Sequence, residues 1–294
     1  MEDLEKYREM GKKLFDKLKL FTYPIAIKMI KKGDEMPKGK FFRPHEYFGD
    51  WVPTCTAHIT TRTSGLSLYI EGADIECCPS SYLYYGLDEC ENHPEPIYEG
   101  WARYGGFKKD LAAEHSSRAN DYTFAPGELQ GFITSPLNDT LVKPDVVLIF
   151  CFPVSLGHLI LSATYEGDCI NSDFNGYEAS CKGVVKTYKT DQCNIGCPGY
   201  GDHCVGIASD FETIFFIPES KLEMVVNNLF ESGHKEGPGG RGVTGIESED
   251  ARGVFSFPNA HPTVGPMQVF GKSFNPPQHK YTRRRDKNKK YPGI

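Results

Sequence analysis

Three cysteines that could bind a metal or a cofactor, Cys193, Cys197 and Cys204, lie close together in the segment YKTDQCNIGCPGYGDHC. A turn rich in Gly and Pro separates them, and Gly196 and Gly199 would let the backbone approach a bound group closely. Backbone N–H groups in such turns can point at the sulfides of an iron–sulfur cluster. The alternative is that GCPGYGD is a tight turn between two strands. The segment therefore allows one wall of a cofactor site, and other segments would have to supply the remaining ligands.

The chain contains ten cysteines, an excess that bears on the same question. Its N-terminal residues are charged throughout and have no signal-peptide core, which predicts a cytoplasmic protein. Reducing compartments disfavour disulfides, so cysteines there more often serve metal, cluster or redox chemistry. The sequence has no C-x2-C zinc knuckle and no three-cysteine ferredoxin run, so ligands would come from distant segments. This favours a 4Fe-4S cluster, then unliganded or redox-reactive thiols, then zinc, with a disulfide framework last.

Four other side chains are candidates for chemistry. His58 follows Cys55 by three residues, about one helical turn, so a helix would place the two on one face. His158 follows PVSLG at a predicted strand–loop–helix junction, where α/β proteins often contact ligands. Lys28 follows the apolar run IAI and could meet an anionic substrate or end a strand at the surface, and Glu212 stands just before the last predicted strand. For each histidine, a core or surface role is the commoner alternative.

The elements that would position these residues follow from apolar periodicity and turn signals. Residues 2–21 have the helical spacing of apolar side chains. The segment CTAHITTRTSG predicts a short helix that ends at Gly65, and CCPSSYLYYGL a turn into a helix with Pro79 near its start. Strands are predicted in TYPIAIKMI and LSLYI, and strand–loop–helix units in 143–167 and 210–233. Together these predict mixed α/β layers in one large domain, with Cys151 a buried thiol of an aliphatic strand rather than a ligand.

Composition and charge limit the partners. The net charge of -6 argues against nucleic acid, and the longest apolar runs are interrupted or too short to span a membrane. Residues 88–122 are predicted to be exposed surface. Residues 233–294 are Gly-rich and then basic, so the predicted domains are a cysteine-containing α/β core, 1–232, and a C-terminal extension, 233–294. An ordered extension would be an arm for homo-oligomer formation.

An ordered series of segments resembles a known family. YPIAIKMI, SPL followed by KPDVVLIF, SCKGVV, GCPGYGD and DFETIFFIP occur in that order. The series is similar to the prokaryotic domain-of-unknown-function family 169, which is common in anaerobic bacteria and archaea. The resemblance covers roughly residues 20–230.

The resemblance implies a set of cysteine positions. Family members tend to carry cysteines at the places held here by Cys55, Cys78 and Cys181, and a fourth at Cys197 or Cys193. We therefore predict an oxygen-sensitive iron–sulfur protein, a redox enzyme or cluster-dependent lyase acting on a small organic substrate, with an electron-transfer partner in the redox case. The alternatives are a non-catalytic metal- or cofactor-binding module and a metal-free thiol-redox protein.

Overall fold

The computed structural model describes residues 4–49, 52–75, 78–87, 94–100, 102, 106–172, 174 and 179–232. The chain divides into two units, Met1–Lys235 and Glu236–Ile294, and all described residues belong to the first. The predicted extension 233–294 lies outside the described residues. The domain boundary near residue 233 and the oligomer arm therefore stay predictions.

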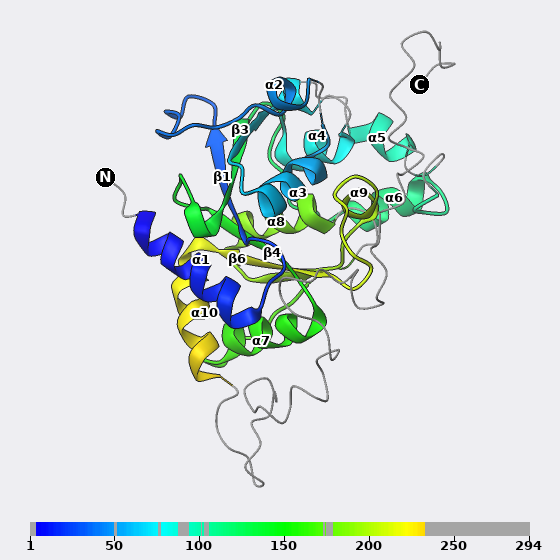
Figure 1. Ribbon diagram of the computed structural model, residues 1–294. Helices are drawn as coiled ribbons and strands as arrows, with labels where there is room; N and C mark the ends of the chain where they lie inside the picture. Colours follow the sequence, from blue (N-terminus) through cyan, green and yellow to red (C-terminus); the bar gives the residue numbers. More distant parts are fainter. Residues whose placement is uncertain are drawn as a thin grey trace, which may run out of the picture. The chain divides into compact units, whose positions relative to one another are not determined.

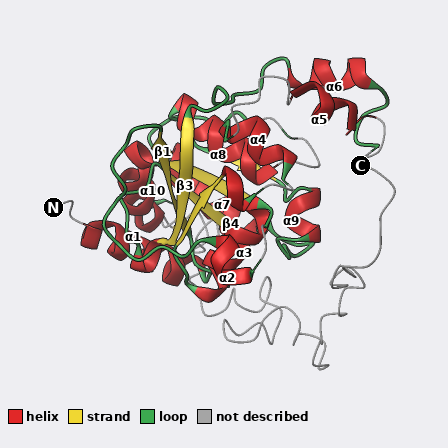
Figure 2. Ribbon diagram, turned by 90° about the horizontal axis from the view of Figure 1, so that it is seen from above, coloured by secondary structure: helices red, strands yellow, loops and turns green. Residues whose placement is uncertain are grey.

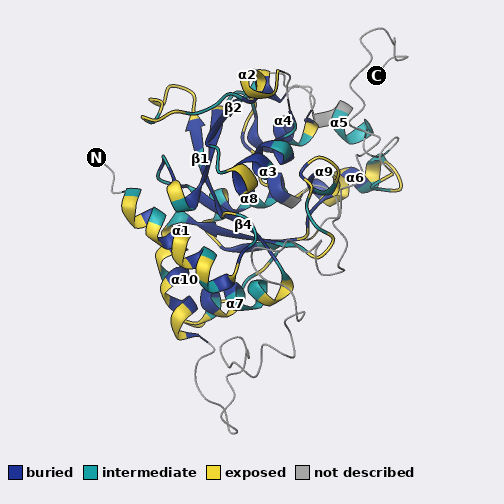
Figure 3. Cartoon of the chain, in the orientation of Figure 1, coloured by how far each residue is buried: buried dark blue, intermediate teal, exposed yellow. Residues whose placement is uncertain are grey.

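Within the described residues, six strands form one antiparallel sheet in the order β2-β3-β1-β4-β6-β5. At its centre β4 runs beside β6, with Val146 paired to Pro218 and Cys151 paired to Thr213. All six positions of β4 are buried, as the dark strands of Figure 3 show. The strands are β1 (Ile25–Lys31), β2 (Leu68–Glu71), β3 (Leu129–Pro136), β4 (Val146–Cys151), β5 (Asn194–Gly196) and β6 (Thr213–Pro218).

Helices cover both faces of this sheet (Figures 1 and 2). Successive residues of a strand point to opposite faces, so Val147 and Ile149 enter one core while Leu148 and Phe150 enter the other. This explains why the central strands β4 and β6 are nearly continuous apolar runs, and the layers confirm the mixed α/β prediction. One face carries α1 (Leu4–Leu18), α7 (Pro153–Thr164) and α10 (Glu219–Glu231); the other carries α3 (Thr54–Ser64), α4 (Pro79–Tyr85) and α8 (Ala179–Thr190).

Predicted turn signals set the ends of several helices. Helix α3 ends before Gly65 and α4 before Gly86, and both glycines have the positive φ, 70° and 58°, that glycine adopts at little cost. Pro79 and Pro153 begin α4 and α7, where proline needs no N–H partner. The two predicted strand–loop–helix units are confirmed as β4 followed by α7 and β6 followed by α10.

Helix α8, which contains SCKGVV, lies directly on the sheet. A Cβ atom added at Gly183 would stand 2.1 Å from a ring carbon of Phe216 in β6. A methyl group would therefore displace the buried Phe216 ring or push the helix away from the strand. The glycine allows the close approach that fixes α8, and with it Cys181, against the sheet.

The remaining helices are short, and two residues of one of them are more deeply buried than the sequence predicts. The prediction that 88–122 is surface holds for most of its described residues, which are exposed or half-buried. Glu114 and Arg118 of α6 are the exceptions, because both are buried. None of the helices among the described residues is both long enough and apolar enough to span a membrane. The short elements are α2 (Pro44–Phe48), η1 (Gly72–Asp74), α5 (Pro94–Gly100), α6 (Leu111–Arg118), η3 (Leu137–Asp139) and α9 (Tyr200–Cys204).

Candidate cofactor site

Three of the predicted cysteines come together on one face of the sheet. Cys55 lies in the first turn of α3, Cys78 immediately precedes α4, and Cys181 lies near the start of α8; all three side chains are buried. Burial raises the pKa of Cys55 well above its ordinary value, and negative charge on Asp202, Cys181 and Cys78 raises it further. A helix N-terminus alone would lower a thiol pKa, so burial decides the outcome here.

Asp202 of α9 completes this group, and we call Cys55, Cys78, Cys181 and Asp202 the thiol site. The carboxylate is 2% exposed. One oxygen accepts a hydrogen bond from Ser180 Oγ at 2.6 Å, and the other accepts from the Gly199 N–H at 2.9 Å. Burial raises the pKa of Asp202, while these bonds and one from Cys55 oppose the rise. The site therefore contains a buried carboxylate that the cysteine pattern did not predict.

A buried hydroxyl group faces the thiol site without a partner. Tyr85 of α4 is fully buried, and its hydroxyl has no hydrogen-bond partner among the described residues. Burial raises its pKa, and the three thiols and the Asp202 carboxylate raise it further. Buried polar groups in native proteins are nearly always paired, so this hydroxyl is available to donate to a group held among the thiols.

The backbone also approaches the site closely. A Cβ atom at Gly201 would stand 2.9 Å from Cys55 Sγ, and one at Gly206 would stand 3.1 Å from Cys55 Cβ. Helix α9 packs against α3 at this point. Gly199, predicted to bind a cofactor, contributes its N–H to Asp202 rather than standing free.

His58 lies one turn beyond Cys55 in a more enclosed position. It is 1% exposed, and neither ring nitrogen has a hydrogen-bond partner among the described residues. Burial lowers its pKa to about 3, and the nearby charge of Arg62 adds to the effect. Arg62 is held in turn by both oxygens of Glu212, at 2.7 and 3.2 Å, in a buried ion pair. Glu212, predicted to be catalytic, thus has a structural partner.

Two of the predicted site residues lie elsewhere. Lys28 lies within β1 rather than after it, and its Nζ pairs with Asp145 Oδ1 at 2.8 Å. His158 lies in the middle of α7, on the opposite face of the sheet from the thiol site. The structure does not bring either side chain to the cysteines.

The two candidates for the fourth cysteine ligand also lie apart from the other three. Cys193 packs in the core beneath α7 and α10, where burial raises its pKa to about 12. It precedes β5, whose last residue, Gly196, pairs with Ile214 of β6. Cys197 is exposed on the following loop. Cys151 is buried in the same core as Cys193, as predicted for a strand thiol.

The described residues contain no preformed coordination site for a single metal ion. In the part of the chain that the structure describes, no group of three or more His, Cys, Asp or Glu side chains is arranged to hold a metal ion. A zinc site would need four ligands around one ion. In an iron–sulfur cubane each thiolate binds a different iron, so the sulfurs stand further apart.

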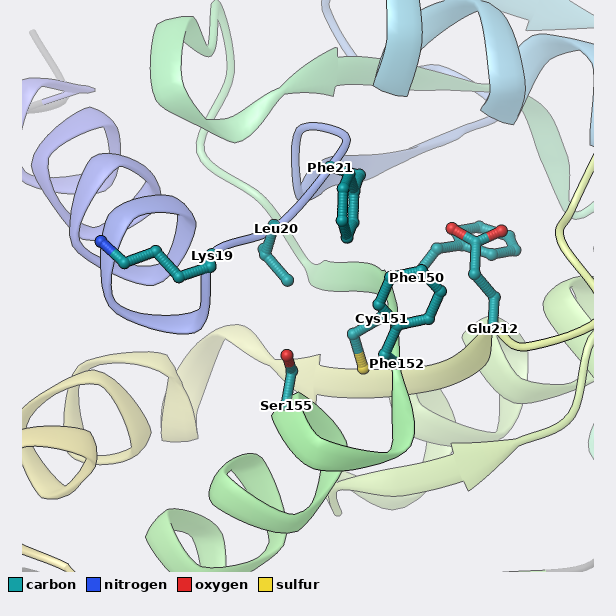
Figure 4. Close-up of a pocket in the computed structure, with 8 residues that line it drawn as sticks. All are labelled: Lys19, Leu20, Phe21, Phe150, Cys151, Phe152, Ser155 and Glu212. Carbon is teal, nitrogen blue, oxygen red and sulfur yellow. The ribbon is translucent and has the colours of Figure 1, made fainter. Parts of the chain in front are cut away.

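A small pocket lies at the end of the sheet beside Glu212 (Figure 4). Its volume of about 10 Å³ is roughly that needed for one water molecule, so it has no room for an organic substrate in this conformation. It is lined by Lys19, Leu20, Phe21, Phe150, Cys151, Phe152, Ser155 and Glu212.

The burial of His58 predicts an acid-dependent loss of stability in the metal-free protein. The folded state holds its pKa at about 3, against 6.5 ordinarily, so between these values the unfolded chain binds the proton more readily. The free energy of unfolding should therefore fall as pH drops below about 6.5, by about 2 kcal/mol between pH 7 and pH 5. Urea unfolding of the wild type and His58→Gln would measure this. The variant should lack that part of the slope, and equal slopes would contradict the prediction.

The fold and the site define a mixed α/β protein with a buried group of thiols and one carboxylate. The chain belongs to the DUF169 family, described as "Uncharacterised ArCR", whose model matches residues 13–228. It is also similar to the uncharacterized protein MJ0308 of Methanocaldococcus jannaschii, with 25% identity over 229 residues, 76% of this chain and 94% of the relative. No solved structure matches the chain. The predicted family is confirmed.

Proposed function

We propose that the thiol site binds an iron–sulfur cluster of the 4Fe-4S type. The observation that carries the proposal is the meeting of Cys55, Cys78 and Cys181, three buried thiols from three separate elements. In this proposal the protein is an oxygen-sensitive redox enzyme or cluster-dependent lyase that acts in the cytoplasm on a small organic substrate. A redox role would add an electron-transfer partner.

The surroundings of the thiols fit such a group. The unpaired hydroxyl of Tyr85 could donate a hydrogen bond to a cluster sulfide, and bonds of this kind tune reduction potential. Gly201 and Gly206 leave room for the backbone to pass close to Cys55. When bound, the cluster would supply a one-electron carrier or an iron that polarises a substrate oxygen. The protein would keep water away from the cluster, because all three cysteines are buried.

Iron analysis of protein prepared without oxygen tests the proposal. Purified or reconstituted protein should contain iron and acid-labile sulfide in equal amounts and show visible charge-transfer absorption that air bleaches. Zinc measured in the same sample separates the cluster from a zinc site. Absence of iron and sulfide after anaerobic reconstitution would refute the cluster.

A metal-free thiol-redox protein is the second candidate. It is favoured by the fact that Cys78 and Cys181 are buried cysteines close enough to Cys55 to raise the pKa of its thiol. In that case mild oxidation of iron-free protein should form a reversible disulfide between two of these three residues. Mass mapping under non-reducing conditions would detect it.

A further inference from the structure

We propose that helix α7 forms the contact between two copies of this chain, which pack the outer sides of their α7 helices together, antiparallel, about a two-fold axis. The helix lies on the opposite face of the sheet from the thiol site, so the inference is independent of the proposed function. It also differs from the predicted oligomer arm, because α7 belongs to the α/β core.

The outer side of α7 is a line of uncharged and mostly apolar side chains. Val154, Leu161 and Tyr165 are 45%, 37% and 45% exposed, and His158 between them is half-buried. We call these four residues the α7 stripe. Their i, i+4, i+7, i+11 spacing is that of the a and d positions in a coiled coil, so all four lie along one side of the helix, where a second helix can pack against them.

The composition of α7 is unusual for a helix at a protein surface. It contains no Asp, Glu, Lys or Arg, whereas a surface helix normally carries charged residues on its outer side. The chain has a net charge of -6, so two copies repel each other through most of their surface, and an uncharged stripe avoids that repulsion at the contact. At Gly157, an added Cβ atom would have no described atom within 4 Å, which leaves room for another helix to approach closely.

The two ends of α7 carry opposite charge, which favours the antiparallel arrangement. The start of the helix is the positive end of its dipole and has no side-chain cap. The exposed Lys19 lies near this end, since it lines the same small pocket as Ser155. The other end, which is negative, is followed by the exposed Glu166. In an antiparallel pair, the positive end of each helix lies beside the negative end of the other.

A two-fold axis through the middle of the stripe defines the residue pairs. It places Val154 opposite Tyr165 of the second copy and His158 opposite Leu161 of the second copy, and each pair occurs twice. The helix has 12 residues and is therefore about 18 Å long. One helix pair of this length is at the small end of specific interfaces, so the dimer should dissociate on dilution. A lipid surface is the other apolar occupant, but α7 lacks the Lys and Arg side chains with which interfacial helices bind anionic lipid.

A charge-pair rescue tests the arrangement in the full-length protein. Light scattering across a concentration series should show the wild type reaching the mass of two chains. Val154→Glu and Tyr165→Lys should each remain monomeric at those concentrations, because each would bury an unpaired charge. The double variant should dimerise again, and added salt should weaken it, since the new carboxylate of each copy then meets the new amine of the other. The two positions are about 16 Å apart on one helix, so the pair cannot form within a copy.

Phe211→Glu is the matched control, because Phe211 is an equally apolar side chain outside α7 and is 72% exposed. It should dimerise like the wild type, and thermal melting shows whether each variant folds. The proposal is overturned if the wild type is monomeric throughout, or if the single variants dimerise as the wild type does. A double variant that stays monomeric overturns the antiparallel pairing. A monomeric wild type that sediments with phosphatidylglycerol vesicles would assign the α7 stripe to a lipid surface instead.

Discussion

Cys55→Ser, Cys78→Ser and Cys181→Ser should each remove most of the iron and lower the thermal stability of the reconstituted protein. A hydroxyl is a poor replacement for a thiolate ligand of iron. A group that binds only the folded state stabilises it by mass action, by about 2.7 kcal/mol at one hundred times its dissociation constant. Losing a ligand therefore removes both the cofactor and its contribution to folding. Iron and sulfide analysis, with melting of the same samples, measures the two effects together.

The other face of the sheet supplies matched controls. Cys151 and Cys193 are also buried thiols, but they pack in the core beneath α7 and α10. Cys151→Ser and Cys193→Ser should cost stability through burial of a hydroxyl and leave the iron content unchanged. The prediction is contradicted if Cys193→Ser loses iron like the first three variants, or if those three variants keep their iron. In either case Cys55, Cys78 and Cys181 are not the residues that hold the iron.

The sequence predicts the central strands and the helices that follow them, because their apolar patterns are continuous and lie within short segments. Strands β4 and β6 are buried on both faces, which leaves unbroken apolar runs, and each leads into a helix whose periodicity is clear. Strand β3 was not predicted, since Gly131 and the exposed Gln130 interrupt its pattern. Helix α8 was not predicted either. Gly183 weakens its helical signal, and only the contact with Phe216 explains why glycine is needed there.

The site was predictable only in part. The resemblance indicated Cys55, Cys78 and Cys181, and the structure brings these three together. It could not indicate which side of the sheet Cys193 would enter, since that depends on how β5 pairs with β6. Asp202 carried a sequence signal, an acidic residue three positions after a turn glycine. Its burial beside Cys55, however, arises from the packing of α9 on α3.

Buried ion pairs and hydrogen bonds connect α4, α6 and α8 beside the thiol site. Arg118 of α6 donates to Glu114 and to the Tyr84 hydroxyl, and it pairs with Asp121 at 3.2 Å. Asp121 also binds Lys182, at 2.6 Å. Tyr84 directly precedes Tyr85 in α4, and Lys182 directly follows Cys181 in α8. The network therefore joins α4 and α8 next to the thiol site.

Removing the arginine should therefore be strongly destabilising. The side chains of Arg118 and Glu114 are 3% and 0% exposed, so Arg118→Met would fill a similar volume but leave Glu114 buried without its cation. Breaking a buried pair in this way typically costs about 3–5 kcal/mol. Lys6→Met is the control, because Lys6 pairs with Glu223 at an exposed position, where such a pair is worth about 1 kcal/mol or less. Urea unfolding of the three metal-free proteins compares these costs. If Arg118→Met unfolds at the same urea concentration as Lys6→Met, the network does not hold α4 and α8 together.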